Sequence, residues 1–146
     1  MQRKRLAESW PSEGLKLQAY EKTPIYKAAR DLLRDGHLLV ARIEKTFKFT
    51  LGAQINQYTF NLAEAIFLAY EENEDEQKKL HLIKEIGNHT QKLLVAYRIA
   101  FDLNLIPRGN ESQLGFAIQV GRIVHIIAQY RNWSQKLEAS LKTQQR

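Results

Sequence analysis

Apolar and small residues recur at alternating steps of four and three along the stretch from residue 25 to residue 43. The positions are Ile25, Ala29, Leu32, Gly36, Leu39 and Ile43. This spacing places one narrow apolar seam along a helix, which is typical of helices that pack nearly side by side. Thr23 is a suitable N-cap, and Pro24 follows at the first helical position, where a missing N–H costs nothing. We therefore expect a long helix that starts at Pro24.

Three further stretches repeat apolar side chains at helical spacing. They cover residues 51 to about 72, residues 80 to 101 and residues 111 to about 141. The joints between them are short: "KTFKFT", the acidic "EENEDEQKK" and "NLIPRGNES". With only 7 glycines and 3 prolines in 146 residues, the chain has few positions that break regular structure. The pattern predicts four long helices rather than a β fold with many turns.

The predicted fold class is all-α, an antiparallel up-down-up-down four-helix bundle of one domain. The bundle is expected over residues 23–142, with a frayed tail at residues 143–146. Residues 1–22 are expected to form a loosely ordered N-terminal arm, or an arm docked by Trp10 and Tyr20.

The joints carry candidate helix caps. Thr50 is expected to cap the second helix, and the phenylalanines beside it are expected to close that end of the bundle. Asn110 is expected to cap the fourth helix together with Gln113. The elbow "KTFKFT" is therefore interpreted mainly as a connection, not as a platform for stacked bases.

Glycines and apolar runs inside the helices predict close packing. Gly36, Gly87 and Gly121 each cost about 1 kcal/mol relative to alanine, and their phase favours tight approach between helices. Gly121 belongs to a small-residue stripe of the fourth helix that also contains Ala117, Val124 and Ala128. The second helix is apolar on most sides, which indicates self-association or coverage of Phe60 or Phe67 by the arm.

The charge is basic and unevenly distributed. Lysine and arginine number 22 against 16 acidic residues, for a net charge of +6. The excess is +5 in residues 1–50 and +3 in residues 101–146, whereas residues 51–100 sum to −2. Opposite the apolar seam, the first helix and its extension carry a cationic stripe of Lys27, Arg30, Arg34, His37, Lys45 and Lys48. Such a surface binds phosphates without reading sequence.

Several kinds of chemistry lack their residues in this chain. There is no cysteine, no glycine-rich phosphate loop and no convincing metal-ligand spacing around the four histidines. We therefore expect no cofactor and no metal. Neither a secretory signal nor an apolar run of membrane-spanning length occurs, which favours a cytoplasmic protein without a membrane partner.

Three stretches together resemble a known family of four-helix bundles. They are "TPIYKAARDLL", "FKFTLGAQI" and "VGRIVHIIAQYRNW", in this order over roughly residues 23 to 135. The family includes the accessory variability determinants of diversity-generating retroelements and, more distantly, proteins encoded in 23S rRNA intervening sequences. One departure is His125-Ile126, where relatives often carry small residues.

The resemblance implies a non-enzymatic accessory protein that forms a homopentamer and supports mutagenic cDNA synthesis. Its implied partners are a reverse transcriptase and template RNA or an RNA/DNA hybrid. The residues predicted to contact phosphates are Lys27, Arg30, Arg34, Arg42, Lys45, Lys48 and Arg122.

Two alternatives stay open at the level of sequence. The first is an RNase of the HEPN class, because Arg30 and His37 have six residues between them and formally match its short motif. The second is a structural or interaction bundle with no role in binding nucleic acid.

Overall fold

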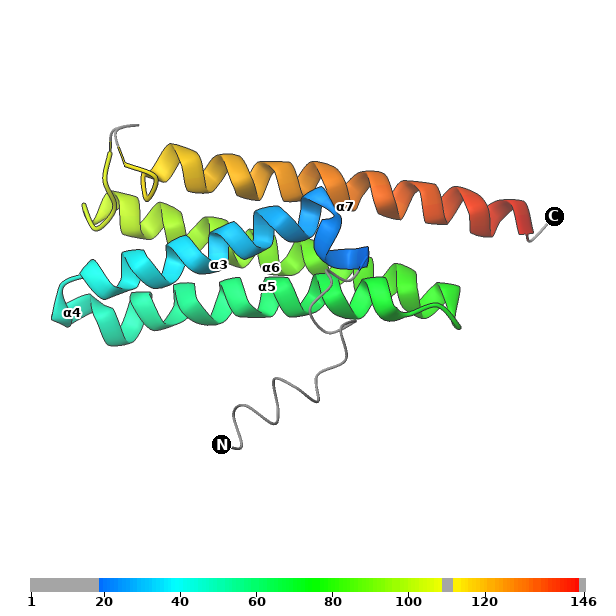
Figure 1. Ribbon diagram of the computed structural model, residues 1–146, viewed down its shortest axis with the longest axis horizontal. Helices are drawn as coiled ribbons and strands as arrows, with labels where there is room; N and C mark the ends of the chain where they lie inside the picture. Colours follow the sequence, from blue (N-terminus) through cyan, green and yellow to red (C-terminus); the bar gives the residue numbers. More distant parts are fainter. Residues whose placement is uncertain (1–18, 109–111, 145–146) are drawn as a thin grey trace, which may run out of the picture.

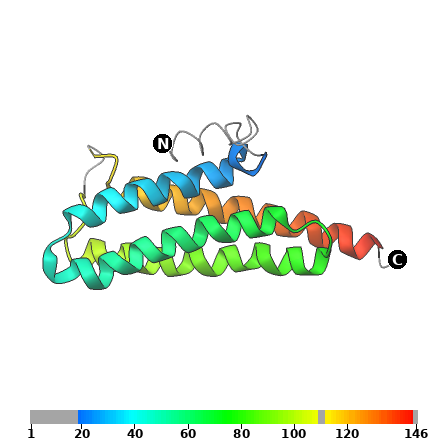
Figure 2. The same ribbon diagram turned by 60° about the horizontal axis from the view of Figure 1, so that its bottom comes forward.

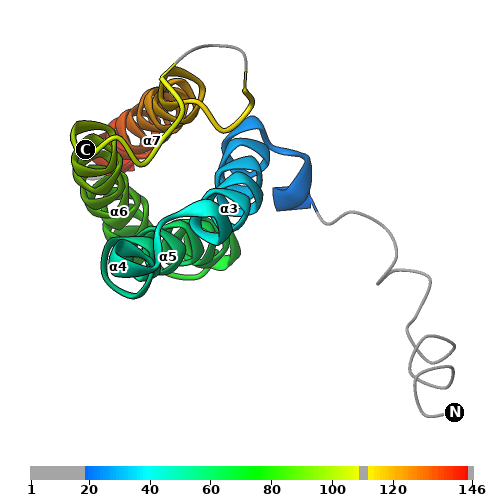
Figure 3. The ribbon, with the colours of Figure 1, turned by 90° about the vertical axis from the view of Figure 1, so that its left-hand side faces the viewer.

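A computed structural model of the chain describes residues 19–108 and 112–144. In these ranges the protein is an all-α four-helix bundle, which confirms the predicted fold class. Its long helices are α3 (Pro24–Arg42), α5 (Ala53–Glu71), α6 (Glu76–Asp102) and α7 (Phe116–Gln144). Figure 1 shows consecutive helices running in opposite directions along the long axis. In the end-on view of Figure 3, α3, α5, α6 and α7 follow one another around the bundle, and α7 also contacts α3.

The start of α3 is the one that the sequence predicts. The Thr23 hydroxyl accepts a hydrogen bond from the Tyr26 N–H at 3.3 Å, and Pro24 is the first helical residue. The six predicted seam residues of this helix are all buried. Before the helix, the short 3-10 turn η1 (Ala19–Lys22) places Tyr20 edge-on against Tyr26 and Phe67. Tyr20 therefore docks the described end of the arm, while Trp10 lies outside the described residues.

The elbow after α3 differs from the prediction. The α3 helix ends at Arg42 because Ile43 is extended, with φ −70° and ψ 139°. A short helix α4 (Lys45–Phe47) and a π-helical turn η2 (Lys48–Gly52) then lead directly into α5, at the left of Figure 2. Lys45 and Lys48 therefore do not continue the stripe of the first helix, and that prediction was wrong.

Thr50 does not cap α5, because it lies inside the π-helical turn. Its hydroxyl donates to the Phe47 carbonyl at 3.3 Å, and Gly52, the residue before α5, already has helical backbone angles. Phe47 packs against the core as predicted, but Phe49 is 74% exposed and does not close the bundle. A Cβ at Gly52 would lie 2.9 Å from Val40 Cγ1, so glycine permits this close approach between the elbow and α3.

The connection between α6 and α7 is longer than predicted. The α7 helix begins at Phe116 rather than near residue 111, because Ser112 and Gly115 form a turn closed by a 3.0 Å backbone hydrogen bond. Ile106 and Leu114 on either side of this connection are buried, so it covers the end of the bundle. The predicted cap Asn110 lies outside the described residues. At its other end α7 continues to Gln144.

The small-residue stripe of α7 does not lie in the core. Its buried positions are Gln119, Ile123, Ile126 and Ser134, whereas Ala117, Gly121, Val124 and Ala128 are exposed. A Cβ at Gly121 would meet nothing within 4 Å, so the predicted tight approach at this glycine was wrong. Gly87 does lie in a close contact, because a Cβ there would come 2.6 Å from the Tyr130 hydroxyl.

Candidate nucleic-acid interface

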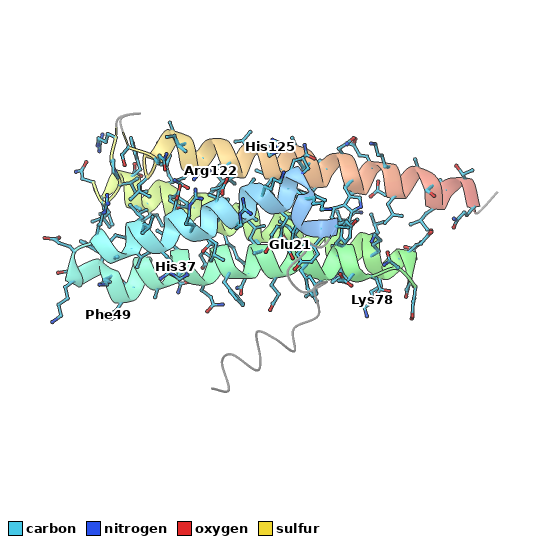
Figure 4. All side chains as sticks on the ribbon, in the orientation of Figure 1. Glu21, His37, Phe49, Lys78, Arg122 and His125 are labelled. Atoms are coloured by element: carbon cyan, nitrogen blue, oxygen red, sulfur yellow. The ribbon has the colours of Figure 1, made fainter. Side chains whose placement is uncertain are left out.

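The outward side of α3 is basic. Lys27, Arg30, Arg34 and His37 are all exposed there, and we call these four residues the basic face. The Arg30 and Arg34 side chains are 52% and 55% exposed. Figure 4 shows His37 near the middle of α3, away from Phe49 at the elbow. Helical spacing thus places four nitrogen-bearing side chains along one line where a phosphate backbone could lie.

The elbow adds cations at one end of α3. Arg42 and Lys45 are exposed, and Lys48 is half-buried. Among the residues that the structure describes, Lys27, Arg42 and Lys45 take part in no ion pair. Arg42, Lys45 and Lys48 belong to different elements. The distances between their charges therefore depend on the conformation of the elbow and not on helical spacing.

The acidic residue on the basic face neutralises it only weakly. Asp31 Oδ1 lies 3.9 Å from an Arg30 nitrogen and 3.5 Å from an Arg34 nitrogen. Solvent-exposed ion pairs contribute about 0–1 kcal/mol to stability and exchange readily with water and other anions. Arg30 therefore remains accessible to a phosphate, whereas Arg34 also forms a 3.1 Å ion pair with the buried Asp35.

Beneath the basic face, Asp35 is buried at 2% exposure. Its carboxylate accepts hydrogen bonds from Arg34 Nε at 3.1 Å, from Gln119 Nε2 at 3.2 Å and from the Arg122 guanidinium. We call these four residues the Asp35 network. Burial by itself would raise the pKa of Asp35, but the hydrogen bonds from Arg122, Gln119 and Arg34 hold that pKa below its ordinary value.

The Asp35 network joins α3 to α7. Gln119 also donates to the Gln113 carbonyl at 2.7 Å, and Arg122 donates to the Gln119 side-chain oxygen at 3.2 Å. Only 21% of the Arg122 side chain is exposed, and Figure 4 shows this residue at the side of α7 that adjoins α3. Arg122 therefore differs from the other predicted phosphate ligands, because its charge is turned inward and balanced by a carboxylate.

The spacing of Asp35 and Gln119 relative to buried apolar residues predicts that both are buried, although both are polar. Asp35 lies three residues after Leu32 and four before Leu39, which is the spacing of the buried seam itself. Gln119 lies four residues before the buried Ile123. A polar residue type argues against burial at both positions, whereas the phase of the neighbouring apolar positions places both residues inside the bundle.

Arg30 and His37 share the exposed side of α3. His37 lies seven positions after Arg30, which corresponds to about 10 Å of helix rise. Among the described residues, neither Arg30 nor His37 lines the grooves beside α6 or the pocket at the start of α3. Within residues 19–108 and 112–144 there is also no group of three or more histidine, aspartate or glutamate side chains that could hold a metal ion.

The opposite side of the bundle exposes apolar grooves. One groove, of about 350 Å³, lies between α6 and the segment formed by η2 and α5, and it includes Leu51 and Tyr58. Another groove, of about 450 Å³, lies between α6 and α7 and includes Phe116. Val95 and Ile99 line both grooves and are 58% and 44% exposed. The two grooves thus flank one apolar ridge on α6.

Comparison with protein-family models, with curated proteins and with solved structures found no match. No helix among the described residues has the length and apolar character needed to cross a membrane.

Proposed function

We propose that this protein is a non-enzymatic accessory subunit of a diversity-generating retroelement. In this proposal it binds the reverse transcriptase and its template RNA, or an RNA/DNA hybrid, and supports mutagenic cDNA synthesis. The proposal rests on the resemblance of the three quoted stretches together with the charge and exposed surfaces of the bundle. A cytoplasmic location belongs to the same proposal.

The observation that carries the nucleic-acid part is the exposed basic face of α3, together with the cations at the elbow. Lys27, Arg42 and Lys45 have no ion-pair partner in the described part of the chain, and Arg30 pairs only with the partly exposed Asp31. Arg34 pairs with Asp31 and with the buried Asp35, but its side chain is 55% exposed. Phosphate contacts of this kind give affinity through counterion release and do not specify sequence. The proposed contacts are Lys27, Arg30, Arg34, Arg42, Lys45 and Lys48. Arg122 is left to the Asp35 network.

The proposal includes self-association, as a homopentamer. Its support is the apolar ridge on α6, because monomeric soluble proteins rarely leave large contiguous apolar surface in water. Val95 and Ile99 are both exposed and are bordered by grooves on both sides. On α5, Phe60 is 53% exposed, while Phe67 is covered in part by Tyr20.

The salt dependence of RNA binding tests the basic face. A triple variant with Lys27, Arg30 and Arg42 changed to glutamine should bind single-stranded RNA more weakly than the natural protein. Each lost phosphate contact should reduce the slope of log Kd against log salt by about 0.7, so the triple variant should lose about 2 units of slope.

The matched control changes Lys92, Arg131 and Lys142 to glutamine. These residues are exposed on α6 and α7, so the control removes the same net charge from other surfaces. It should retain most of the slope. Equal losses in the two triple variants would show that only the overall charge matters, and absence of RNA binding by the natural protein would overturn the nucleic-acid proposal.

Light scattering tests the self-association. The proposed pentamer has five times the 17.0 kDa monomer mass. Val95→Glu should reduce the particle to smaller species, whereas Leu38→Glu, at a 50% exposed apolar position on α3, should leave the mass unchanged. A natural protein that scatters as a monomer would contradict this part of the proposal. Binding to a reverse transcriptase is tested separately, by co-expression and co-purification with a retroelement reverse transcriptase from the same genome.

A further inference from the structure

A third pocket, of about 550 Å³, lies where the start of α3 meets α5, α6 and the second half of α7. This volume falls in the range of about 300–1,000 Å³ that is usual for small-molecule sites. Its floor includes the buried Ile25 and Ile66, and its walls include the half-buried Tyr70 and Trp133. We call it the aromatic pocket. It is far along the bundle from the elbow and shares no lining residue with the two apolar grooves.

One wall of the aromatic pocket carries a fixed positive charge. Lys79 Nζ donates hydrogen bonds to the carbonyls of Ala69 at 2.9 Å, Tyr70 at 3.3 Å and Glu72 at 2.8 Å. The same nitrogen lies 5.9 Å from the ring centroid of Tyr70 and 5.5 Å from that of Trp133. Burial lowers the pKa of Lys79, and the neighbouring Glu72 and Glu71 oppose that shift.

Lys79 is therefore an electrostatic group and not a nucleophile. Its ammonium donates to backbone carbonyls at the end of α5, which uses its protons and holds the side chain in place. Because these partners are neutral, the charge of Lys79 is not cancelled as that of Arg122 is. The pocket thus combines a cation with the faces of two aromatic rings.

The rim of the pocket adds hydrogen-bonding groups and a second cation. Gln129 and Asn132 line it, and neither side-chain amide has a hydrogen-bond partner among the described residues. Lys136 lines it one helical turn further along α7 and is exposed. Among the described residues, no carboxylate lines the pocket. The nearby Glu72 is already bound to the N–H groups of Glu74 and Asp75 and paired with Lys78.

From this arrangement we propose that the aromatic pocket binds a single unpaired nucleotide of an RNA strand. The base packs against Trp133 and Tyr70, the amides of Gln129 and Asn132 bond its edge, and Lys136 binds the adjacent phosphate. Unpaired RNA bases are commonly held by aromatic side chains and by hydrogen bonds to their exposed edges. This inference rests on the proposed RNA-binding function and adds to it a site that contacts a base.

Tryptophan fluorescence tests the inference directly. The chain has two tryptophans, Trp10 and Trp133, so the full-length Trp10→Phe variant reports on the pocket alone. Nucleoside 5′-monophosphates should quench its emission saturably when excitation is at the red edge of tryptophan absorption. Ribose 5-phosphate, which carries the phosphate without a base, should not. Absence of quenching, or equal quenching by ribose 5-phosphate, would overturn the inference.

Substitutions in the same background locate the site. Asn132→Ala and Lys136→Gln should each weaken the nucleotide affinity measured by quenching, by about three- to tenfold. The matched controls Gln135→Ala and Lys142→Gln change exposed residues of the same helix that do not line the pocket, and should leave the affinity unchanged. Equal effects of the paired variants and controls would contradict a site in this pocket.

Failure of this inference is distinguishable from failure of the proposed function. RNA binding that depends on Lys27, Arg30 and Arg42 but produces no Trp133 quenching would leave the basic face intact and exclude the pocket. Nucleotide quenching without any salt-dependent RNA binding would support a nucleotide site but would overturn the wider RNA-binding proposal on which its role rests.

Discussion

The two halves of α7 are fixed to the bundle by different physical interactions. The first half contributes Gln119 and Arg122 to a buried carboxylate, Asp35 of α3. The second half contributes two aromatic residues. Tyr130 packs over Gly87 of α6, and Trp133 lies beside Tyr70 of α5. One helix thus combines a directional polar contact with an area of aromatic packing.

The difference explains where charge is available on this protein. In the first half, Arg122 is inward and its charge is balanced by Asp35. Beside the second half, Lys79 is held by neutral carbonyl oxygens, and Lys136 is exposed. A buried ion pair stabilises one arrangement but attracts no external anion, whereas an ammonium bound to carbonyls still contributes a positive potential.

The largest loss of stability is expected when the Asp35 network, which holds the first half of α7, is disrupted. Arg122→Met leaves the Asp35 carboxylate, which is 2% exposed, without its charged partner on α7. Removing one member of a buried ion pair typically costs about 3–5 kcal/mol, and because Arg34 remains bound to Asp35 we expect about 2 kcal/mol here. Urea unfolding measures this loss. Arg131→Met, at an exposed position of the same helix, is the control and should be nearly neutral.

A smaller loss of stability is expected when the hydrogen bonds of Lys79, beside the second half of α7, are removed. Lys79→Met deletes three hydrogen bonds to neutral carbonyl oxygens at the end of α5, but it leaves no buried charge without a partner. We expect a loss of about 1–2 kcal/mol in the free energy of unfolding. Lys78→Met, at the labelled residue at the start of α6 in Figure 4, should change stability by less than about 0.5 kcal/mol. A larger loss for Lys79→Met than for Arg122→Met would reverse the ranking of the two halves.

Glycine substitutions compare the packing of the two halves. Gly121→Ala adds a methyl group in open space and should stabilise the protein by about 1 kcal/mol through helix propensity. Gly87→Ala should instead destabilise it by about 1 kcal/mol, because the new Cβ would lie 2.7 Å from the Tyr130 ring carbon Cζ. Thermal unfolding of both variants measures the difference. Stabilisation by both would show that the Tyr130 ring shifts without cost.

The smallest expected effect is a difference in acid stability. The folded-state pKa of Asp35 is below its ordinary value near 4, so the unfolded chain binds its proton more readily. The resulting stabilisation is complete above pH about 4 and is lost as the pH falls through the folded-state pKa. Asp35→Asn should therefore unfold with a flatter dependence on pH below 4, whereas Asp31→Asn, at a 30% exposed residue, should keep the natural slope. Identical slopes for the two variants would contradict the shifted pKa.

The prediction of the core from sequence succeeded where apolar residues and helix phase agree. The seam of α3, its Thr23 cap and its Pro24 start are as predicted. On α7 the two signals disagree, because Gln119 occupies a core phase while Val124 occupies an exposed one. Arg122 was predicted to contact phosphate, and Gly121 was predicted to approach a neighbouring helix. The rotation of α7 instead turns Arg122 toward Asp35 and Gly121 toward open space.

At the elbow the sequence was insufficient for a different reason. The stretch "KTFKFT" resembles an N-cap followed by a helix, but a π-helical turn forms instead and carries the chain into α5 without an extended residue. The local sequence permits either conformation. In the observed π-helical conformation, Gly52 lies close to Val40 and Ile43 of the preceding segment.

The sequence by itself determined that the chain forms an all-α bundle of four long helices with a basic first helix. The reason is that helical periodicity, caps and net charge are properties of residues close together in the chain. Tertiary structure alone decided that Arg122 turns inward, that Gly121 is exposed and that Lys79 meets Tyr70 and Trp133. These features depend on the rotation of each helix against its neighbours, which follows from packing the whole core at once.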